Sequence, residues 1–388
     1  MVSSFIVISL SITKDESFDY KGEMMMKKRA RAWGLPLEGQ PGTYNAITDV
    51  SGVEVGMTTL IDPAKKMQTG VTAILPRGRD HLLTPVWAGV HSFNGNGEMT
   101  GTHWIRDGGY FMSPIVLTNS HGVGVAHDAV TRWMIERDRD VYEREHVWAM
   151  PVVAETYDGV CNDILAMHVT REDVEEALNR ASSGPVAEGN VGGGTGMMTY
   201  EYKGGSGTSS RIVQVSGETY TVGVFVQSNF GRRPWLTVCG VPIGRQFPVE
   251  PFREADQGSI IAIIATDAPL HPHQLEKLAR RATLGIGRTG TVGGNGSGDL
   301  FLAFSTANER DTPQVGQTLE TLTFINDEKL DRLYEGVVQA TEEAVLHAML
   351  MADPVTAVKP EGMVVETLPG ERVSSIVKRV YEKGEEGY

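Results

Sequence analysis

The residues most able to do chemistry are Gly258 and Ser259, where a small hydroxyl residue follows a glycine and precedes an apolar run at 260–265. Because Gly258 hinders its own carbonyl carbon little, the Ser259 hydroxyl could attack that carbon and move the acyl group from nitrogen to oxygen. The new α-amine, with an ordinary pKa of about 7.7–8.0, could then act as general base for the hydroxyl of the same residue. A Gly-Ser turn before a strand is also common, so on these two residues alone a plain turn is the more usual interpretation.

Two other patterns resemble ligand sites but lack the necessary context. Residues 285–290 match the GxGxxG pattern of dinucleotide sites. Such a loop works between a strand and the start of a helix, whereas here a helical pattern precedes it and a strand pattern follows. His271 and His273 stand without an HExxH pattern, and a solvent-facing helix start explains them better than a zinc site. We therefore expect neither a cofactor nor a metal.

The elements that must position Ser259 are short Val/Ile-rich runs and fewer, longer amphipathic segments. The short runs lie between glycines and predict strands at 47–55, 70–75, 113–117, 150–153, 220–226, 260–265 and 300–305. The longer segments repeat apolar residues every three or four positions and predict helices at 128–137, 171–181, 271–283 and 326–351. Runs of strands interrupted by a few helices favour an α+β fold in which helices cover stacked sheets.

Length and composition favour one globular domain over residues 27–388. With 388 residues, 40% of them hydrophobic and 22% charged, the chain can build a packed interior. The Gly-rich stretch 184–207 is the one candidate break, but both of its halves look sheet-forming. The apolar run at 5–10 lacks the positive start and cleavage site of a signal peptide and is too short to span a bilayer. Residues 1–26 are therefore expected to be a disordered or spurious extension.

Charge and cysteine usage argue against several classes of partner. The formal net charge of -14 would repel phosphate backbones, and no basic stripe occurs beyond the short run 27–31. We expect neither nucleic acid nor membrane as a partner. The two cysteines, Cys161 and Cys239, have no zinc or disulfide spacing, which fits a reducing, cytoplasmic compartment.

A series of short motifs, in order along most of the chain, is more specific than any one of them. The motifs lie at 34–36, 44–50, 93–98, 153–159, 189–196, 227–231, 256–270, 295–299 and 305–307. Through them the chain from about 30 to about 351 resembles the L-aminopeptidase/D-Ala-esterase/amidase family, which includes the β-peptidyl aminopeptidases. The resemblance implies a four-layer α-β-β-α sandwich, similar to N-terminal-nucleophile hydrolases but with different strand connectivity. It also implies self-cleavage between Gly258 and Ser259 into two associated chains, 27–258 and 259–388.

The resemblance further implies roles for single residues. Ser259 matches the nucleophile, and Asn229 matches a residue that stabilises the oxyanion, a task suited to amide donors. Tyr157 is expected near the reacting carbonyl as a donor. Glu155 resembles the carboxylate that receives the free ammonium of the substrate, which would favour N-terminal residues. Simpler alternatives are a strand-end carboxylate with a structural partner at Glu155 and a turn residue at Asn229.

Ser297 and Asp299 match a pair that orients the new amine of Ser259. At the position of Asp299 some family members carry Glu, and Ser297 could equally complete a Gly-rich turn. These matches predict a serine aminopeptidase, amidase or esterase that acts on small peptides, amides or esters with a free N-terminal amine. One alternative is an acyltransferase similar to the ornithine acetyltransferases, although that family carries Thr where this chain has Ser259. Another is a catalytically silent binding protein. Family members form tetramers, so a homo-oligomer is expected.

Overall fold

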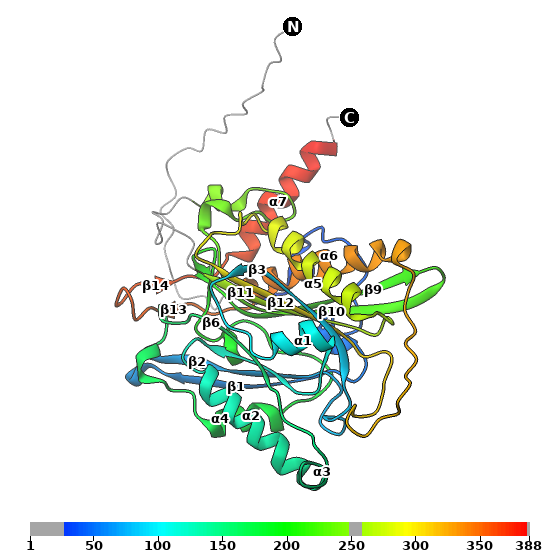
Figure 1. Cartoon of the computed structure of the whole chain (residues 1–388). Helices are drawn as coiled ribbons and strands as arrows, with labels where there is room; N and C mark the ends of the chain where they lie inside the picture. Colours follow the sequence, from blue (N-terminus) through cyan, green and yellow to red (C-terminus); the bar gives the residue numbers. More distant parts are fainter. Residues whose placement is uncertain (1–26, 248–257, 386–388) are drawn as a thin grey trace, which may run out of the picture.

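Two β-sheets form the centre of the molecule (Figure 1). The computed structural model describes residues 27–247 and 258–385, so the extension expected over 1–26 lies outside the described part. The larger sheet has the order β4-β3-β12-β11-β10-β9, from β4 (Tyr110–Phe111), β3 (Val86–Gly95), β12 (Gly298–Ser305), β11 (Ser259–Thr266), β10 (Glu218–Asn229) and β9 (Gly205–Val215). The smaller has the order β1-β2-β5-β6, from β1 (Glu54–Asp62), β2 (Met67–Leu75), β5 (Ile115–Asn119) and β6 (Val152–Thr156). Two small pairs join β7 (Met198–Thr199) to β8 (Tyr202–Lys203) and β13 (Val355–Thr356) to β14 (Val364–Val365).

Helices cover the outer faces of both sheets. On the larger sheet lie α5 (Pro272–Arg288) and α6 (Asp331–Leu350), and on the smaller lie α2 (Val123–Arg137) and α4 (Arg171–Asn179) (Figure 1). The remaining α-helices are α1 (Thr102–Gly108), α3 (Arg139–Arg144) and α7 (Gly370–Glu385). Short 3-10 helices lie at Ala30–Trp33, Ile47–Asp49, Pro63–Lys65, Ile164–Ala166, Gly192–Gly194, Arg233–Trp235, Ile243–Gln246 and Asp327–Lys329. The layers follow the order helix, sheet, sheet, helix, which confirms the predicted α+β sandwich.

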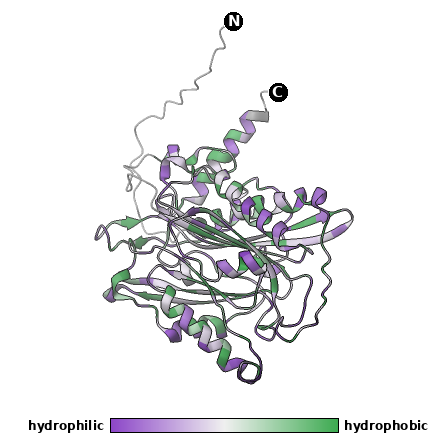
Figure 2. Ribbon diagram, in the orientation of Figure 1, coloured by the Kyte–Doolittle hydropathy of each residue, from purple (hydrophilic) through white to green (hydrophobic). Residues whose placement is uncertain are grey.

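The strand that begins at Ser259 lies inside the larger sheet and is buried along its whole length. Its side chains alternate between two cores, with Ile260 and Ile264 beneath α5 and α6, and Ile261 and Ile263 between the sheets. Full burial of one such side chain contributes about 1.5–3 kcal/mol. Figure 2 shows hydrophobic residues along the strands of the two central layers. β11 therefore anchors Ser259 on a firmly held element.

Most predicted strands are confirmed, since six of the seven segments overlap β2, β5, β6, β10, β11 and β12. The prediction for 47–55 is wrong, because Ile47–Asp49 forms a 3-10 helix and β1 begins only at Glu54. The Asp49 carboxylate accepts hydrogen bonds from the main-chain N–H groups of Tyr44 at 2.9 Å and Ala46 at 3.1 Å. These bonds stabilise a turn where the apolar pattern had suggested an extended chain.

The four predicted helices are confirmed as α2, α4, α5 and α6, with ends shifted by a few residues. The GxGxxG segment at 285–290 begins in the last turn of α5. Its glycines therefore lie at a helix C-terminus, where main-chain carbonyls carry the partial negative charge. This is an unfavourable place for a phosphate group.

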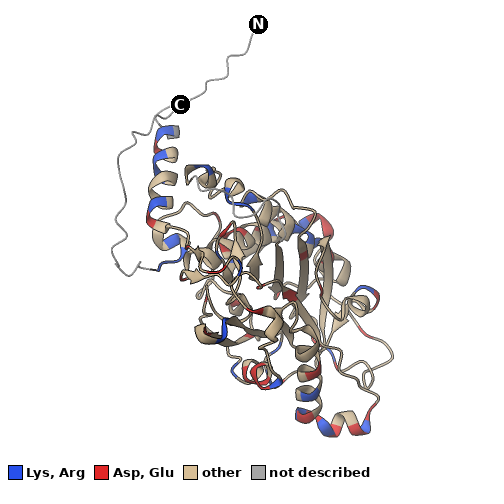
Figure 3. Ribbon diagram, turned by 90° about the vertical axis from the view of Figure 1, so that its left-hand side faces the viewer, with Lys and Arg blue, Asp and Glu red and all other residues tan. Residues whose placement is uncertain are grey.

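Charged residues of both signs lie along the outer helices (Figure 3). In α7, Val373 and Val377 are buried, whereas Glu371 and Lys378 are exposed.

Across the described residues, none of the helices is both long and apolar enough to cross a membrane.

Candidate active site

Three strands of the larger sheet bring the predicted site together at one end of the sandwich. Ser259, the first residue of β11, pairs with Asn229, the last residue of β10. On the other side it pairs with Gly298, the first residue of the parallel strand β12. An antiparallel neighbour ends where β11 starts, and a parallel neighbour starts there as well. The sheet topology thus places residues distant in sequence next to one another.

The Ser259 side chain is buried, with 5% of its residue surface exposed, and lies against the carbonyl that precedes it. Its Oγ donates a hydrogen bond to the Gly258 carbonyl oxygen at 2.8 Å. The Gly298 N–H points at both atoms, 3.2 Å from Ser259 Oγ and 3.2 Å from the Gly258 oxygen. A donor on this carbonyl oxygen can stabilise the negative charge that develops there when the carbon is attacked.

Gly258 is also required by packing. A Cβ at this position would lie 2.1 Å from the Asn229 carbonyl oxygen and 2.5 Å from the Phe230 Cα. Only glycine lets the chain pass this close to the end of β10. This close packing is a second reason for glycine at position 258, besides access to its carbonyl carbon.

The Asn229 side-chain amide is buried and held on both sides. Its Oδ1 accepts a hydrogen bond from the Met198 N–H at 2.8 Å, and its Nδ2 donates to the Tyr157 carbonyl oxygen at 2.9 Å. One donor and one acceptor determine which way the amide faces. Nδ2 carries a second hydrogen that can serve a negatively charged oxygen beside Ser259.

Glu155 lies near the end of β6, on the opposite sheet, and is 7% exposed. Ser120 donates a short hydrogen bond to Oε2, and the Glu98 N–H donates to Oε1 at 3.0 Å. Burial raises the pKa of Glu155, and these hydrogen bonds offset only part of the rise. A Cβ on Gly97 would lie 3.3 Å from Glu155 Oε1 and 3.5 Å from the Gly298 Cα, so one glycine separates this carboxylate from the strand beside Ser259.

Ser297 and Asp299 flank Gly298 and are both buried. The Ser297 hydroxyl donates to Asp299 Oδ1 at 2.7 Å, and Asn94 Nδ2 donates to Asp299 Oδ2 at 2.8 Å. Gly298, which lies between them, pairs with Ser259 on β11. Ser297 and Asp299 therefore lie on either side of the residue opposite Ser259.

Tyr157 joins the site through its main chain. Its carbonyl oxygen accepts the bond from Asn229, while the side chain is exposed on 41% of the residue surface. The phenol lies over Gly159, where a Cβ would approach the Tyr157 oxygen to 2.3 Å. Among the predicted catalytic and substrate-binding residues, Tyr157 is the one whose side chain lies at the surface.

Sequence reasoning missed the groups that hold the predicted residues in place. They are the Ser120 hydroxyl on Glu155, the Asn94 amide on Asp299, and the main-chain N–H groups of Met198 and Gly298. Asn94 stands in the quoted motif 93–98, which was a usable signal. The other three depend on turns and strand register that the sequence does not display.

Known proteins match most of this chain in sequence and in fold. Residues 45–362 match peptidase family S58. The β-peptidyl aminopeptidase BapA of Sphingosinicella microcystinivorans is 47% identical over 373 residues, which cover 90% of this chain and 92% of that protein. The structure of an L-aminopeptidase D-Ala-esterase/amidase from Ochrobactrum anthropi, described as a prototype of the serine aminopeptidases with a variant of the Ntn hydrolase fold, matches with a TM-score of 0.85.

That match has 51% identity and covers 91% of this chain and 99% of the other. A β-aminopeptidase from Burkholderia sp. matches with a TM-score of 0.83 at 41% identity, over 91% of this chain and 99% of its own. These likenesses confirm the predicted family, and the chain therefore belongs to peptidase family S58, as a serine aminopeptidase of the N-terminal-nucleophile type.

Proposed function

We propose that this chain cuts itself between Gly258 and Ser259 and works as two associated fragments, residues 27–258 and 259–388. The Ser259 hydroxyl attacks the Gly258 carbonyl carbon, and the oxygen of that carbonyl takes up negative charge beside the Gly298 N–H. Collapse of this intermediate breaks the C–N bond between Gly258 and Ser259, the freed α-amine takes up the hydroxyl proton, and the acyl group stays on Ser259 Oγ as an ester. Water then hydrolyses the ester, which leaves a carboxylate on Gly258 and a free hydroxyl on Ser259. The 2.8 Å contact between Ser259 Oγ and the Gly258 oxygen supports this step.

In the processed enzyme the α-amine of Ser259 accepts the proton of its own hydroxyl, which attacks the substrate carbonyl. Asn229 Nδ2 stabilises the oxyanion, and Ser297 with Asp299 orients the amine. The exposed phenol of Tyr157 is a further donor to the carbonyl of the bound substrate. As the tetrahedral intermediate collapses, the substrate C–N or C–O bond breaks and the leaving amine or alcohol takes the proton from the α-amine. Water then hydrolyses the acyl-enzyme ester and releases the acyl group as a carboxylic acid. The substrates are small peptides, amides or esters, as the names of the relatives suggest.

Glu155 gives this reaction its preference for a free N-terminal amine. Gly97 lies between the Glu155 carboxylate and Gly298. Gly298 pairs with Ser259, which carries the nucleophilic hydroxyl. A substrate ammonium bound to Glu155 therefore holds its own carbonyl within reach of Ser259. This adjacency is the observation that carries the proposed function.

Replacing Glu155 with glutamine tests that assignment. A charge-assisted hydrogen bond contributes about 1.5–3 kcal/mol, so we expect KM for a substrate with a free amine to rise roughly 10- to 100-fold. Turnover of the N-acylated analogue should change much less. Because burial raises the pKa of Glu155, acid should weaken binding of the free amine at a higher pH than for an ordinary carboxyl group.

Glu98→Gln is the matched control, since it removes an exposed carboxylate and keeps the main-chain N–H that donates to Glu155. Its kinetics with both substrates should stay close to those of the unmodified enzyme. Equal losses for the free and acylated substrates in Glu155→Gln would remove Glu155 from the amine site.

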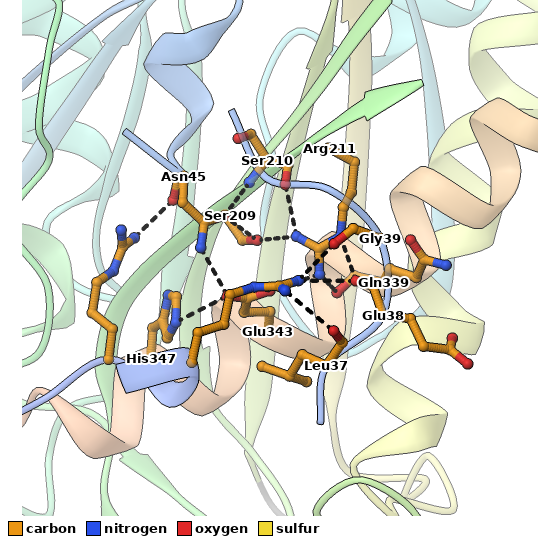
Figure 4. A network of polar contacts seen from close by, with 12 residues as sticks. Leu37, Glu38, Gly39, Asn45, Ser209, Ser210, Arg211, Gln339, Glu343 and His347 are labelled. Carbon is orange, nitrogen blue, oxygen red and sulfur yellow. Dashed lines mark hydrogen bonds and ion pairs between the residues drawn. The ribbon is translucent and has the colours of Figure 1, made fainter. Parts of the chain in front are cut away.

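A buried ionic cluster joins the two proposed fragments (Figure 4). Glu343 and His347, on α6, belong to the fragment 259–388. Glu343 Oε2 accepts a hydrogen bond from Arg211 Nη2 at 2.6 Å, and its Oε1 lies 3.0 Å from Arg31 Nε. The His347 ring contacts Glu188 at 3.2 Å and Glu343 at 3.4 Å. Three of these partners, Arg31, Glu188 and Arg211, belong to 27–258, so the cluster supports lasting association after the cut.

The cluster makes stability depend on pH through His347. Burial alone would lower the pKa of His347, but the Glu188 and Glu343 carboxylates outweigh it and raise the pKa to about 9. Because the protonated form of His347 is favoured in the folded state, its contribution to stability is fully present below about pH 6.5 and is lost as the pH rises through about 9. The shift corresponds to roughly 3 kcal/mol.

We expect the Tm to fall between pH 7 and pH 10, and His347→Gln to lessen that fall. Parallel pH profiles for the two proteins would contradict this role.

A cytoplasmic location and a homo-oligomer, with four copies as in the family, complete the proposal. Cys161 and Cys239 are both buried thiols, as a reducing compartment allows. Light scattering on the purified enzyme measures the number of copies.

A further inference from the structure

Lys203 is buried without exposed surface, although it carries an ammonium group. Its Nζ donates hydrogen bonds to the main-chain carbonyl oxygens of Met197 at 2.6 Å and Gly204 at 2.7 Å. Burying a charge is costly, and an apolar side chain of similar length would fill the same space at less cost. The position of this ammonium therefore calls for a specific reason.

The Met197 carbonyl belongs to the same peptide unit as the Met198 N–H, which donates to Asn229 Oδ1 at 2.8 Å. The short β7–β8 pairing, in which Met198 faces Lys203, holds this unit against the end of β10. Two further bonds fix the same hairpin on that strand, from Thr199 Oγ1 to the Ser228 oxygen at 2.9 Å and from the Tyr200 N–H to the Phe230 oxygen at 2.7 Å. A continuous chain of hydrogen bonds thus runs from the ammonium to the Asn229 amide.

We propose that Lys203 is a positioning residue that orients and polarises the Asn229 amide through the Met197–Met198 peptide unit. The proposal rests on the oxyanion role of Asn229 given above. Nζ–H withdraws electron density from the Met197 carbonyl, which makes the Met198 N–H a stronger donor to Oδ1. That bond in turn makes Asn229 Nδ2 a stronger donor to the oxyanion. Bonds in such a chain reinforce one another, most of all away from water.

The charge of Lys203 is set by the groups around it. Burial lowers the pKa of Lys203 to about 8, and its titratable neighbours, which raise the pKa, offset this only in part. Those neighbours are Cys161 and Asp158, in the loop after β6, and Asp353, in the segment after α6. The ammonium therefore loses its proton as pH rises through about 8, and its polarising effect is lost with it.

The test is a double-mutant cycle on the processed enzyme, from Lys203→Met and Asn229→Ala alone and together. Loss of polarisation should lower kcat roughly 10-fold in Lys203→Met with KM nearly unchanged, because the oxyanion exists only in the transition state. In the Asn229→Ala background, Lys203→Met should cost nothing further, since its route to the substrate is already gone. The kcat ratio of the unmodified enzyme to Lys203→Met should shrink from pH 7 to pH 9.5.

Equal losses in both backgrounds, a pH-independent ratio, or no loss at all would overturn the proposal. A normal kcat in Asn229→Ala would overturn the oxyanion role of Asn229 itself, which separates the two failures. Tyr202→Phe is the control, because it alters the neighbouring residue of the same strand without touching the Met197 carbonyl, and its kcat should be unchanged.

If Lys203→Met does not fold, the unmodified enzyme labelled with 15N-methionine supplies the test. The Met198 amide signal, identified by its absence in Met198→Leu, should move with a midpoint near pH 8. A signal that stays constant over this range would overturn the proposal.

Discussion

Ser259→Ala should give one uncut chain and should lower kcat by about 10⁴-fold or more, the loss typical of removing a serine nucleophile. Both effects have the same cause. In the proposed mechanism, the hydroxyl that lies 2.8 Å from the Gly258 carbonyl oxygen is the attacking group in the cut, and the α-amine that serves as base exists only after the cut. Denaturing electrophoresis and turnover of an amino-acid amide measure the two effects on one preparation.

Ser259→Thr is the matched control, because it keeps both a hydroxyl and, after cleavage, an α-amine. We expect it to be cut and to retain part of the activity, with losses from the extra methyl group in a buried site. Complete cleavage of Ser259→Ala would contradict the proposed chemistry, whatever its residual activity.

Asn229→Ala should lower kcat about 10²- to 10³-fold with little change in KM, as the loss of one oxyanion donor does in other hydrolases. The substitution also leaves the Met198 N–H and the Tyr157 carbonyl without their partner, which lowers stability by about 1–3 kcal/mol. Because the substitution can also slow self-cleavage, kcat must be calculated per molecule of cleaved enzyme. Electrophoresis gives the cleaved fraction.

Asn229→Asp removes the amide donor of the side chain while keeping its size and shape. The aspartate keeps an acceptor for the Met198 N–H but cannot donate to an oxyanion when ionised. We therefore expect its kcat to fall as far as that of the alanine variant. An aspartate variant close to the unmodified enzyme would show that Asn229 serves only to hold the hairpin.

Elements with strong local signals were predictable from sequence. β11 was, since Ser259–Thr266 is apolar on both faces and is buried on both faces. β9 was missed because it opens with Gly205 to Ser210, small and polar residues that lack the usual β-branched pattern, and its backbone is buried by α6 instead. The 47–55 error has the opposite origin, since side-chain bonds from Asp49 override an apolar run.

The site was predictable only in part for a related reason. Family motifs predicted Ser259, Asn229 and Glu155 as site residues, and the structure places them near one another, but the groups that orient them come from register and turns. Lys203 follows a turn whose residues Tyr200 and Glu201 have positive φ, and in sequence it looks like an ordinary surface lysine. Only the fold shows that its side chain points inward, to the peptide unit that holds Asn229.

The most direct test of this account is the mass and N-terminal sequence of the polypeptides in fully active enzyme. We predict two polypeptides in equal amounts, one of which begins Ser-Ile-Ile at residue 259. Full activity in a preparation that contains only the intact chain, with no terminus at Ser259, would contradict the account.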